Sequence, residues 1–129
     1  MRWVVDASSA VAYLLGQGSE AERAGMLSDI HAPDLIDVEV TQTLRGLVRG
    51  AKIELSVAGR AREELAQLGV RRHLDAPLLS RAWELRDVCT VSDALYIALA
   101  EGLDATLITR DAVLANGVKG LIDVALQEL

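Results

Sequence analysis

The sequence has 129 residues, the length of one domain (residues 1–129), and 51% of them are hydrophobic although Phe is absent, so Leu, Val, Ala and Ile must build the core. The formal net charge of −6 argues against a protein that binds nucleic acid through overall charge, and the single cysteine excludes an internal disulfide. Because no apolar stretch approaches the roughly 18 to 20 residues of a membrane helix, and His31 and His73 lack zinc-motif spacing, we expect a cytoplasmic protein without membrane contact.

The first half of the chain alternates short apolar strands with helices. Residues 2–5 are predicted to form a strand, followed by an Ala-, Val- and Leu-rich helix that ends at the Gly-Gln-Gly stretch after Leu15. A short helix over 19–27 carries two glutamates in its first turn, where negative charge is favoured, and a strand is expected at 30–33. Apolar residues then recur at helical spacing in "PDLIDVEVTQTLRGLVRG", which predicts an amphipathic helix closed by Gly50.

The second half continues the alternation. The segment "VRRHLDAP" is expected to be extended or irregular, and Pro77 leads into a helix that carries Trp83, Leu85 and Val88. The other expected elements are a helix at 56–68, a helix at 92–101 ended by Gly102, a strand at 105–109, a helix at 111–117 and a strand near 121–125. Short strands that alternate with helices predict an α/β fold with a parallel sheet between helices.

Four acidic residues lie at or near the junctions of these elements. Asp6 follows the first strand directly, and Asp111 lies just past the strand at 105–109. Because the carboxyl ends of parallel strands share one edge of a sheet, these two residues can meet in a crevice. Asp93 starts the helix that leads to the second of these strands, and Glu39 lies near the start of the amphipathic helix.

A cleft with four carboxylates points to a metal-dependent reaction. Such a cluster repels strongly and needs cations to stay ionised, and Mg²⁺ or Mn²⁺ takes oxygen ligands. With no Lys or His nucleophile beside them, the carboxylates suggest phosphodiester hydrolysis with a metal-activated water.

Each aspartate also has a purely structural interpretation as a helix cap. Asp6 and Asp111 precede helices, and Thr90 to Asp93 matches the capping-box pattern. Glu39 lies inside a helix, where it cannot cap, although a solvated helix face is open to it.

Several stretches, in the same order and spacing, resemble PIN-domain ribonucleases and more narrowly the VapC toxins of bacterial toxin-antitoxin pairs. The stretches are "VVDASSAVAYLL", "APDLIDVEVTQTLRGLVRG", "PLLSRAWELRD" and "DALYIALAEGLDATLITRD", so the resemblance runs over nearly the whole chain. The resemblance implies a PIN-like (Rossmann-like) three-layer sandwich, with helices on both sides of a central, mainly parallel sheet of four or five short strands.

The acidic quartet of the family falls on Asp6, Glu39, Asp93 and Asp111. The resemblance implies that the quartet binds Mg²⁺ or Mn²⁺ and cleaves single-stranded or loop regions of RNA, such as tRNA or rRNA. In the mechanism we expect, the three aspartates hold one or two ions, and Glu39 holds a metal-bound water or acts as a base. The products then carry a 5′-phosphate and a 3′-hydroxyl.

The resemblance also has accessory and divergent positions. It points to Ser8 and Thr109 as polar neighbours that position a metal-bound water or phosphate. Ser92 stands where many relatives carry an aromatic residue, so the loop before Asp93 is expected to present RNA differently.

The resemblance implies protein partners as well. A free ribonuclease toxin harms its own cell, so we expect a cognate VapB-type antitoxin that covers the cleft and offers a basic side chain to it. The apolar composition suits this complex and a homodimer.

The basic residues are unevenly placed. Without the four quartet acids the net charge of −6 becomes −2, and Arg45, Arg49 and Lys52 lie at i, i+4 and i+7. The segment 71–73 and Arg81 add further positive charge. This face either tracks phosphates or forms a solvated surface or an antitoxin-binding rim.

Two other interpretations use the same features. A receiver-type signalling domain has similar size and an acidic pocket, but it needs an acidic pair after the first strand and a phosphorylatable Asp near mid-chain, and "RGAKIELSVAGR" has none. A PIN fold that has lost catalysis would act as a binding module, and the intact quartet argues against it.

Overall fold

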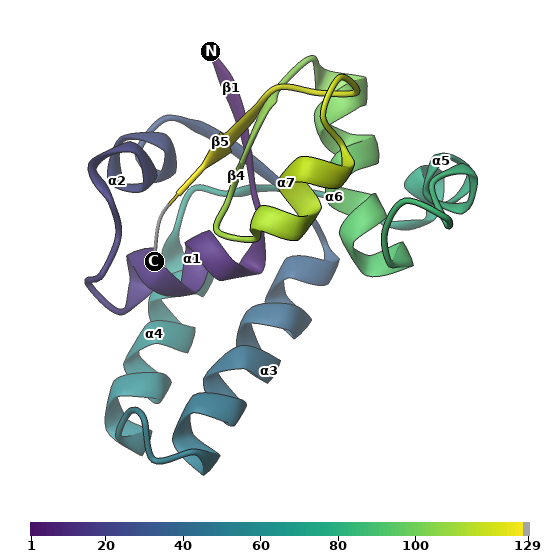
Figure 1. The fold of residues 1–129 in the computed structure, drawn as a ribbon. Helices are drawn as coiled ribbons and strands as arrows, with labels where there is room; N and C mark the ends of the chain where they lie inside the picture. The colour runs from purple at the N-terminus through teal and green to yellow at the C-terminus, as the bar shows by residue number, and fades with distance from the viewer. Residues whose placement is uncertain (128–129) are drawn as a thin grey trace.

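The computed structural model describes residues 1–127 and contains a five-stranded sheet in which all neighbouring strands are parallel (Figure 1). The strands are β1 (Arg2–Val5), β2 (Asp29–Pro33), β3 (Arg71–His73), β4 (Thr106–Thr109) and β5 (Val124–Leu126). Their order is β3-β2-β1-β4-β5, so the chain runs from β1 to one edge and returns to place β4 and β5 on the other side of β1. The predicted α/β fold is confirmed.

Helices flank this sheet on both sides, and α3 and α4 form a hairpin that extends away from it (Figure 1). The helices are α1 (Ala7–Leu14), α2 (Glu20–Met26), α3 (Leu35–Arg49), α4 (Leu55–Gln67), the 3₁₀ turn η1 (Ala76–Leu78), α5 (Leu79–Glu84), α6 (Val91–Leu103) and α7 (Ala112–Gly117). Over residues 1–127, no helix has both the length and the apolar character needed to cross a membrane.

Two helix ends differ from the prediction. The helix after Pro77 ends at Glu84, because the N–H groups of Arg86 and Val88 donate to carbonyls three residues back and tighten the chain into turns. Helix α6 continues through Gly102 to Leu103, and its C-cap, Asp104, has a left-handed φ of 51°. An Asp at this position tolerates the left-handed conformation and so takes the place of a terminating glycine.

Two strands also differ in extent. The expected extended segment contains β3, which pairs with β2 at the edge of the sheet. The last strand begins at Val124, because the N–H of Leu121 donates to the carbonyl of Val118 (2.9 Å) and places the preceding residues in a turn.

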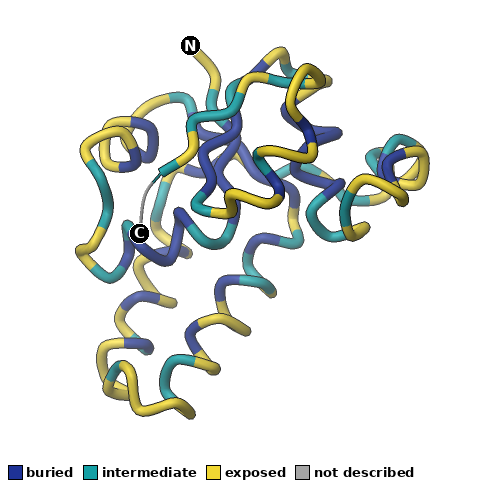
Figure 2. Tube along the Cα trace, in the orientation of Figure 1, coloured by how far each residue is buried: buried dark blue, intermediate teal, exposed yellow. Residues whose placement is uncertain are grey.

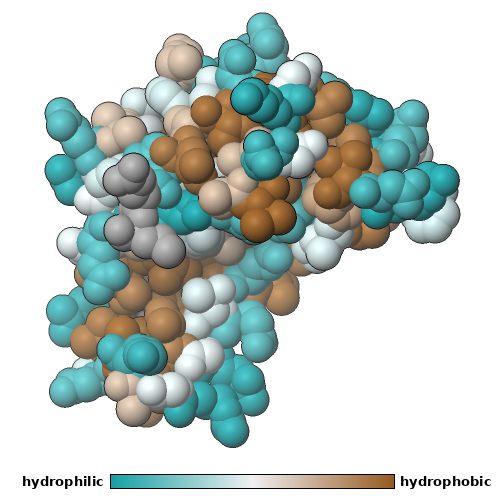
Figure 3. Space-filling view, in the orientation of Figure 1, coloured by the Kyte–Doolittle hydropathy of each residue, from teal (hydrophilic) through white to brown (hydrophobic). Residues whose placement is uncertain are grey.

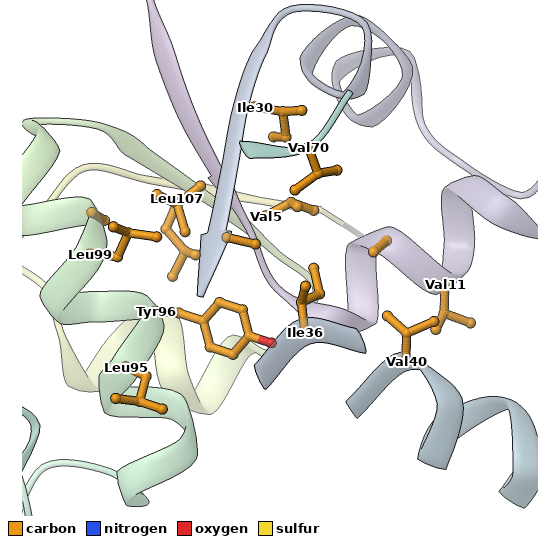
Figure 4. Close-up of a cluster of buried hydrophobic side chains, with 14 of the residues drawn as sticks. Val5, Val11, Ile30, Ile36, Val40, Val70, Leu95, Tyr96, Leu99 and Leu107 are labelled. Carbon is orange, nitrogen blue, oxygen red and sulfur yellow. The ribbon is translucent and has the colours of Figure 1, made fainter. Parts of the chain in front are cut away.

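The core lies between the sheet and its helices. Residues 94–100 of α6 are all buried, and this helix packs on β1, β2 and β4 (Figures 2 and 4). Helix α2 approaches the sheet closely at Gly25, where an added Cβ would lie 2.5 Å from Cδ1 of Ile108. This packing holds the carboxyl ends of β1 and β4 in fixed positions.

The strand order reverses at β1, and this reversal creates the site described below. Val5 lies opposite Ile108, and the N–H of Asp6 donates to the carbonyl of Ile108 (3.2 Å). Asp6 therefore lies beside Thr109, at the type of crevice where open parallel sheets bind ligands.

A candidate acidic site at the carboxyl edge of the sheet

Asp6 is the most constrained side chain at this edge. It is buried (7% exposed) and forms the N-cap of α1, where its Oδ1 accepts a hydrogen bond from the N–H of Ser9 (3.1 Å). Burial raises the pKa of Asp6, and the charge of Asp93 adds to that increase, although the hydrogen bonds to Asp6 lower it. The predicted capping role is confirmed, and it places this carboxylate at the strand end.

The two predicted accessory residues both contact Asp6. The hydroxyl of Ser8 donates to Oδ1 (2.6 Å), and the hydroxyl of Thr109 donates to Oδ2. Thr109 is fully buried, and its oxygen also accepts the N–H of Asp111 (3.0 Å). With their protons directed at Asp6, these hydroxyls orient that carboxylate, and no proton of theirs is left for a phosphate oxygen.

Asp93 lies in the first turn of α6, and Asp111 is the N-cap of α7. The N–H of Asp93 donates to the hydroxyl of Thr90 (3.2 Å), the N-cap of α6, while the side chain of Asp111 caps α7 by accepting the N–H of Leu114 (3.0 Å). Burial raises the pKa of Asp93, and the charge of Asp111 raises it further, against the effect of Thr90. The capping interpretation of Asp111 is confirmed, and this position leaves its carboxylate exposed at the same edge.

Glu39 lies on the second turn of α3, and not at the end of a strand. Its side chain is partly buried, so it does not lie on a fully solvated helix face. Burial raises the pKa of Glu39, and the charges of Asp93 and Asp6 raise it further. These interactions bring Glu39 into the electrostatic surroundings of the aspartates.

The structure therefore gathers the four predicted carboxylates from four elements around one edge. The repulsion pairs are Asp6 with Asp93, Glu39 with Asp6 and with Asp93, and Asp93 with Asp111. Within residues 1–127, no three His, Cys, Asp or Glu side chains already have the arrangement of a metal site. The carboxylates are neighbours that have to turn toward a shared ion to hold it.

The sequence analysis missed Tyr96, the buried tyrosine beside this cluster. Its side chain is 1% exposed, and its hydroxyl has no hydrogen-bond partner of normal geometry among the described residues. The hydroxyl lies against Glu39, close enough to lower the pKa of that carboxyl group. Burial and the negative charge of Glu39 raise the pKa of Tyr96, so the phenol stays protonated. Its spacing of three residues from Asp93, which places both on one side of a helix, was the available signal.

A second missed feature is the buried ion pair between Arg110 and Glu22. The guanidinium donates from Nη2 to Oε1 (2.6 Å) and from Nε to Oε2 (2.9 Å), and Glu22 is fully buried. Burial favours a raised pKa for Glu22, but the hydrogen bonds from Arg110 and from the N–H of Ser19 bring it below its ordinary value. The N–H of Arg110 donates to the hydroxyl of Ser8 (3.1 Å), so the pair anchors the loop between Thr109 and Asp111.

Some of the basic residues predicted to contact phosphates already form ion pairs within the protein. Arg72 forms a bidentate pair with Asp37 (2.7 and 2.9 Å), and Arg81 pairs with Glu101 (2.8 and 3.0 Å). Lys52 lies beyond the end of α3, because the helix closes at Gly50 and Ala51 has a left-handed φ of 56°. The expected i, i+4, i+7 series on one helix is therefore wrong at its last position.

Two apolar grooves lie next to the acidic edge and the α3–α4 hairpin. One, of about 360 Å³, runs between α3 and α4, and Figure 3 shows hydrophobic surface over this hairpin. It is lined by Thr41, Leu44, Arg45, Val48, Arg49, Leu55, Ala58, Gly59 and Arg62. The other, of about 400 Å³, lies along α1 and α3 and reaches Ser8 and Asp111. Apolar floors with arginine at the rim suit an amphipathic partner better than bare phosphates.

The chain matches a known family over most of its length. Residues 3–118 match the PIN domain family. Ribonuclease VapC9 of Mycobacterium tuberculosis is 36% identical over 113 residues, which cover 88% of each chain. Ribonuclease VapC3 of the same organism is 40% identical over 117 residues, which cover 88% of this chain and 85% of the relative.

A solved structure has the same fold. The crystal structure of VapBC2 from Rickettsia felis, bound to a DNA fragment from its promoter, contains a chain that superposes with a TM-score of 0.66. The superposition covers 99% of this chain and 100% of that one at 13% identity. At this identity the likeness concerns the fold alone.

Proposed function

The chain belongs to the PIN domain family, and we propose that it is a metal-dependent endoribonuclease that acts as the toxin of a toxin-antitoxin pair. The observation that carries the proposal is the convergence of Asp6, Glu39, Asp93 and Asp111, from four separate elements, on one edge of the sheet. Burial and mutual repulsion raise the pKa of three of these groups, which is the usual state of a functional acidic cluster. Two similar relatives are named ribonucleases, which supports RNA as the substrate.

The donor set fits Mg²⁺ or Mn²⁺. Both ions take carboxylate oxygens, and a divalent ion offsets the repulsion that raises the pKa of Asp6, Glu39 and Asp93. Asp6, Asp93 and Asp111 would hold one or two ions, with Glu39 as a further ligand, either directly or through a metal-bound water. When bound, such an ion activates a water and offsets the negative charge that develops on the phosphate.

The residues of the chain then have distinct tasks. Asp6 is held still by Ser8, Ser9 and Thr109, so its carboxylate is oriented before a ligand arrives. Glu39, with a raised pKa, is suited to take the proton of the attacking water or to hold that water. Attack at phosphorus with departure of the 3′ oxygen leaves a 5′-phosphate and a 3′-hydroxyl.

We assign structured RNA, such as tRNA or rRNA, as the substrate class. The acidic edge lies open beside Asp111, and Arg45 and Arg49 are exposed on α3. A looped or single-stranded segment can bring one phosphate close to the buried Asp6 without its paired strand meeting the protein surface.

A VapB-type antitoxin is the proposed protein partner. The named VapBC2 structure contains such a pair, and the grooves along α1, α3 and α4 offer apolar floors that lead to the acidic edge. A basic side chain placed over the four carboxylates would offset part of their negative charge and occupy the place of the cation. The exposed apolar side chains of Leu74, Leu79, Trp83 and Val88 around α5 support a homodimer.

Membership of the PIN family excludes the receiver-type alternative. A catalytically inert PIN module is the remaining rival, and mapping RNA ends tests it. Total cellular RNA is incubated with antitoxin-free protein and Mn²⁺ or Mg²⁺, with a chelator as control, and the new 5′ ends are sequenced. Cuts at a few sites that carry a 5′-phosphate and disappear with chelator support the proposal. The absence of cuts by folded protein would favour the inert module.

A further inference from the structure

The phenol of Tyr96 is an energetic anomaly in the core. Its oxygen is buried, and within residues 1–127 it has no hydrogen-bond partner of normal geometry. An unpaired buried hydroxyl costs stability, whereas Phe would fill almost the same volume without a polar atom. In the absence of a ligand, the hydroxyl therefore makes no evident contribution to the stability of the fold.

The Tyr96 hydroxyl faces the start of α3 and the acidic residues. Tyr96 lies one turn after Asp93 on α6, and its ring extends toward the first turn of α3, where Ile36 lies (Figure 4). The acceptor that it approaches is the carboxylate of Glu39, and it also lies within electrostatic reach of Asp6 and Asp93. The hydroxyl thus points into the acidic cluster from its buried side.

A hydrogen-bond donor at this place would orient the carboxylate of Glu39. The carboxylate of Glu39 has to turn toward the ion and keep that orientation beside the charges of Asp93 and Asp6. A hydrogen bond from a neutral donor stabilises the ionised form and limits its rotation without adding a competing positive charge. Donors behind metal-ligating carboxylates have this role in metal sites generally.

We propose that Tyr96 is a positioning residue for Glu39, and that its hydroxyl donates a hydrogen bond to the Glu39 carboxylate in the ion-bound protein. This assignment rests on the proposed metal-dependent function. Because Tyr96 is only 1% exposed, we expect it to act through Glu39 and to contact neither the ion nor the RNA.

The test compares Mn²⁺ binding by wild-type protein, Tyr96→Phe and Tyr13→Phe, measured by electron paramagnetic resonance of the free ion. Tyr13 is the other tyrosine of the chain, lies on α1 and is not among the groups that act on the Glu39 carboxylate. Loss of an outer partner of a metal ligand weakens metal affinity by about tenfold or more, and we expect this for Tyr96→Phe. Tyr13→Phe should bind as the wild type does. Equal affinity in wild type and Tyr96→Phe would overturn the assignment.

A denaturant titration without metal separates positioning from a structural role. Because the hydroxyl is unpaired, Tyr96→Phe should unfold at a midpoint equal to or above that of wild type. A lower midpoint together with unchanged Mn²⁺ affinity would mean that the hydroxyl serves the fold, and the assignment would be wrong.

The Glu39→Gln background shows whether Tyr96 acts through Glu39. In this background Tyr96→Phe should cause no further loss of Mn²⁺ affinity, and a further tenfold loss would contradict the pathway. A different result would refute the proposed function itself. If wild-type protein binds no Mn²⁺, both the proposed metal site and the role of Tyr96 are wrong. Wild-type binding that is insensitive to Tyr96→Phe would remove only the assignment.

Discussion

The hydroxyl of Thr109 donates a hydrogen bond to the carboxylate of Asp6 and so joins two residues 103 positions apart in the chain. The bond connects the carboxyl ends of β1 and β4, the adjacent strands at which the order of the strands reverses. It shows how a parallel sheet turns distant polar residues into direct neighbours.

Replacing Thr109 by Val should therefore impair both the fold and the site. The variant leaves the Asp6 carboxylate and the N–H of Asp111 without this partner, at a cost of about 1–3 kcal/mol in the free energy of unfolding. Metal-dependent cleavage should fall about tenfold. Thr106→Val, on the same strand, is the matched control because no hydrogen bond of its hydroxyl is found in residues 1–127. Equal behaviour of the two variants in urea unfolding and RNA cleavage would refute this account.

The buried pair of Arg110 and Glu22 makes a larger prediction about stability. Arg110→Met should cost about 3–5 kcal/mol, because it leaves a fully buried carboxylate without its partner. Arg81→Met removes an exposed, solvent-screened bidentate pair with Glu101 and should lower stability far less.

A double variant identifies the source of that cost. Adding Glu22→Gln to Arg110→Met removes the stranded charge and should recover part of the lost stability in chemical denaturation. If the double variant is as unstable as the sum of the two single variants, an unpaired buried charge is not the cause.

The acidic cluster predicts how stability depends on pH in metal-free protein. The pKa of Asp93 is raised in the folded state from an ordinary value near 3.8, so the folded protein holds this proton more tightly than the unfolded chain. The resulting stabilisation is fully present below the ordinary pKa and is lost as pH rises through the folded pKa. Glu22 has the opposite effect, because its lowered pKa adds stability above its ordinary value near 4.5.

A comparison of wild type with Asp93→Asn removes the contribution of Asp93 together with its repulsion of Asp6 and Glu39, while the contribution of Glu22 is common to both. From pH 4 upward, the variant should gain stability relative to wild type, as measured by the free energy of unfolding in urea without metal. Saturating Mn²⁺ should reverse the trend, because the ion favours the ionised carboxylate. A difference between the proteins that does not change with pH would disprove the raised pKa of Asp93.

Much of this site follows from patterns along the chain. Strand and helix alternation predicted the parallel sheet, and the positions of Asp6 and Asp111 after two strands predicted a shared edge. The capping patterns also held for Asp6 and Asp111. Capping and the proposed metal binding are compatible here, because a helix N-terminus at a strand end orients a carboxylate toward the crevice.

Contacts that depend on strand pairing and helix packing could not be predicted from the sequence. His31 and His73 are distant in sequence but lie on the paired strands β2 and β3. Nδ1 of His31 is 2.8 Å from Nε2 of His73. Burial, and then the charge of His31, lower the pKa of His73. The pairing of Arg110 with Glu22, and of Arg72 with Asp37, likewise depends on how α2 and α3 settle against the sheet. Local patterns do not encode such partners.

Cleavage of RNA by Asp6→Asn tests the central claim most directly. The variant and a matched control, Asp87→Asn, are compared with wild type on total RNA in Mn²⁺, after circular dichroism confirms that all three are folded. Asp87 is exposed and lies outside the quartet, so its variant should cut as the wild type does. Asp6→Asn should show no metal-dependent cleavage, whereas full activity of folded Asp6→Asn would contradict the acidic site at the sheet edge.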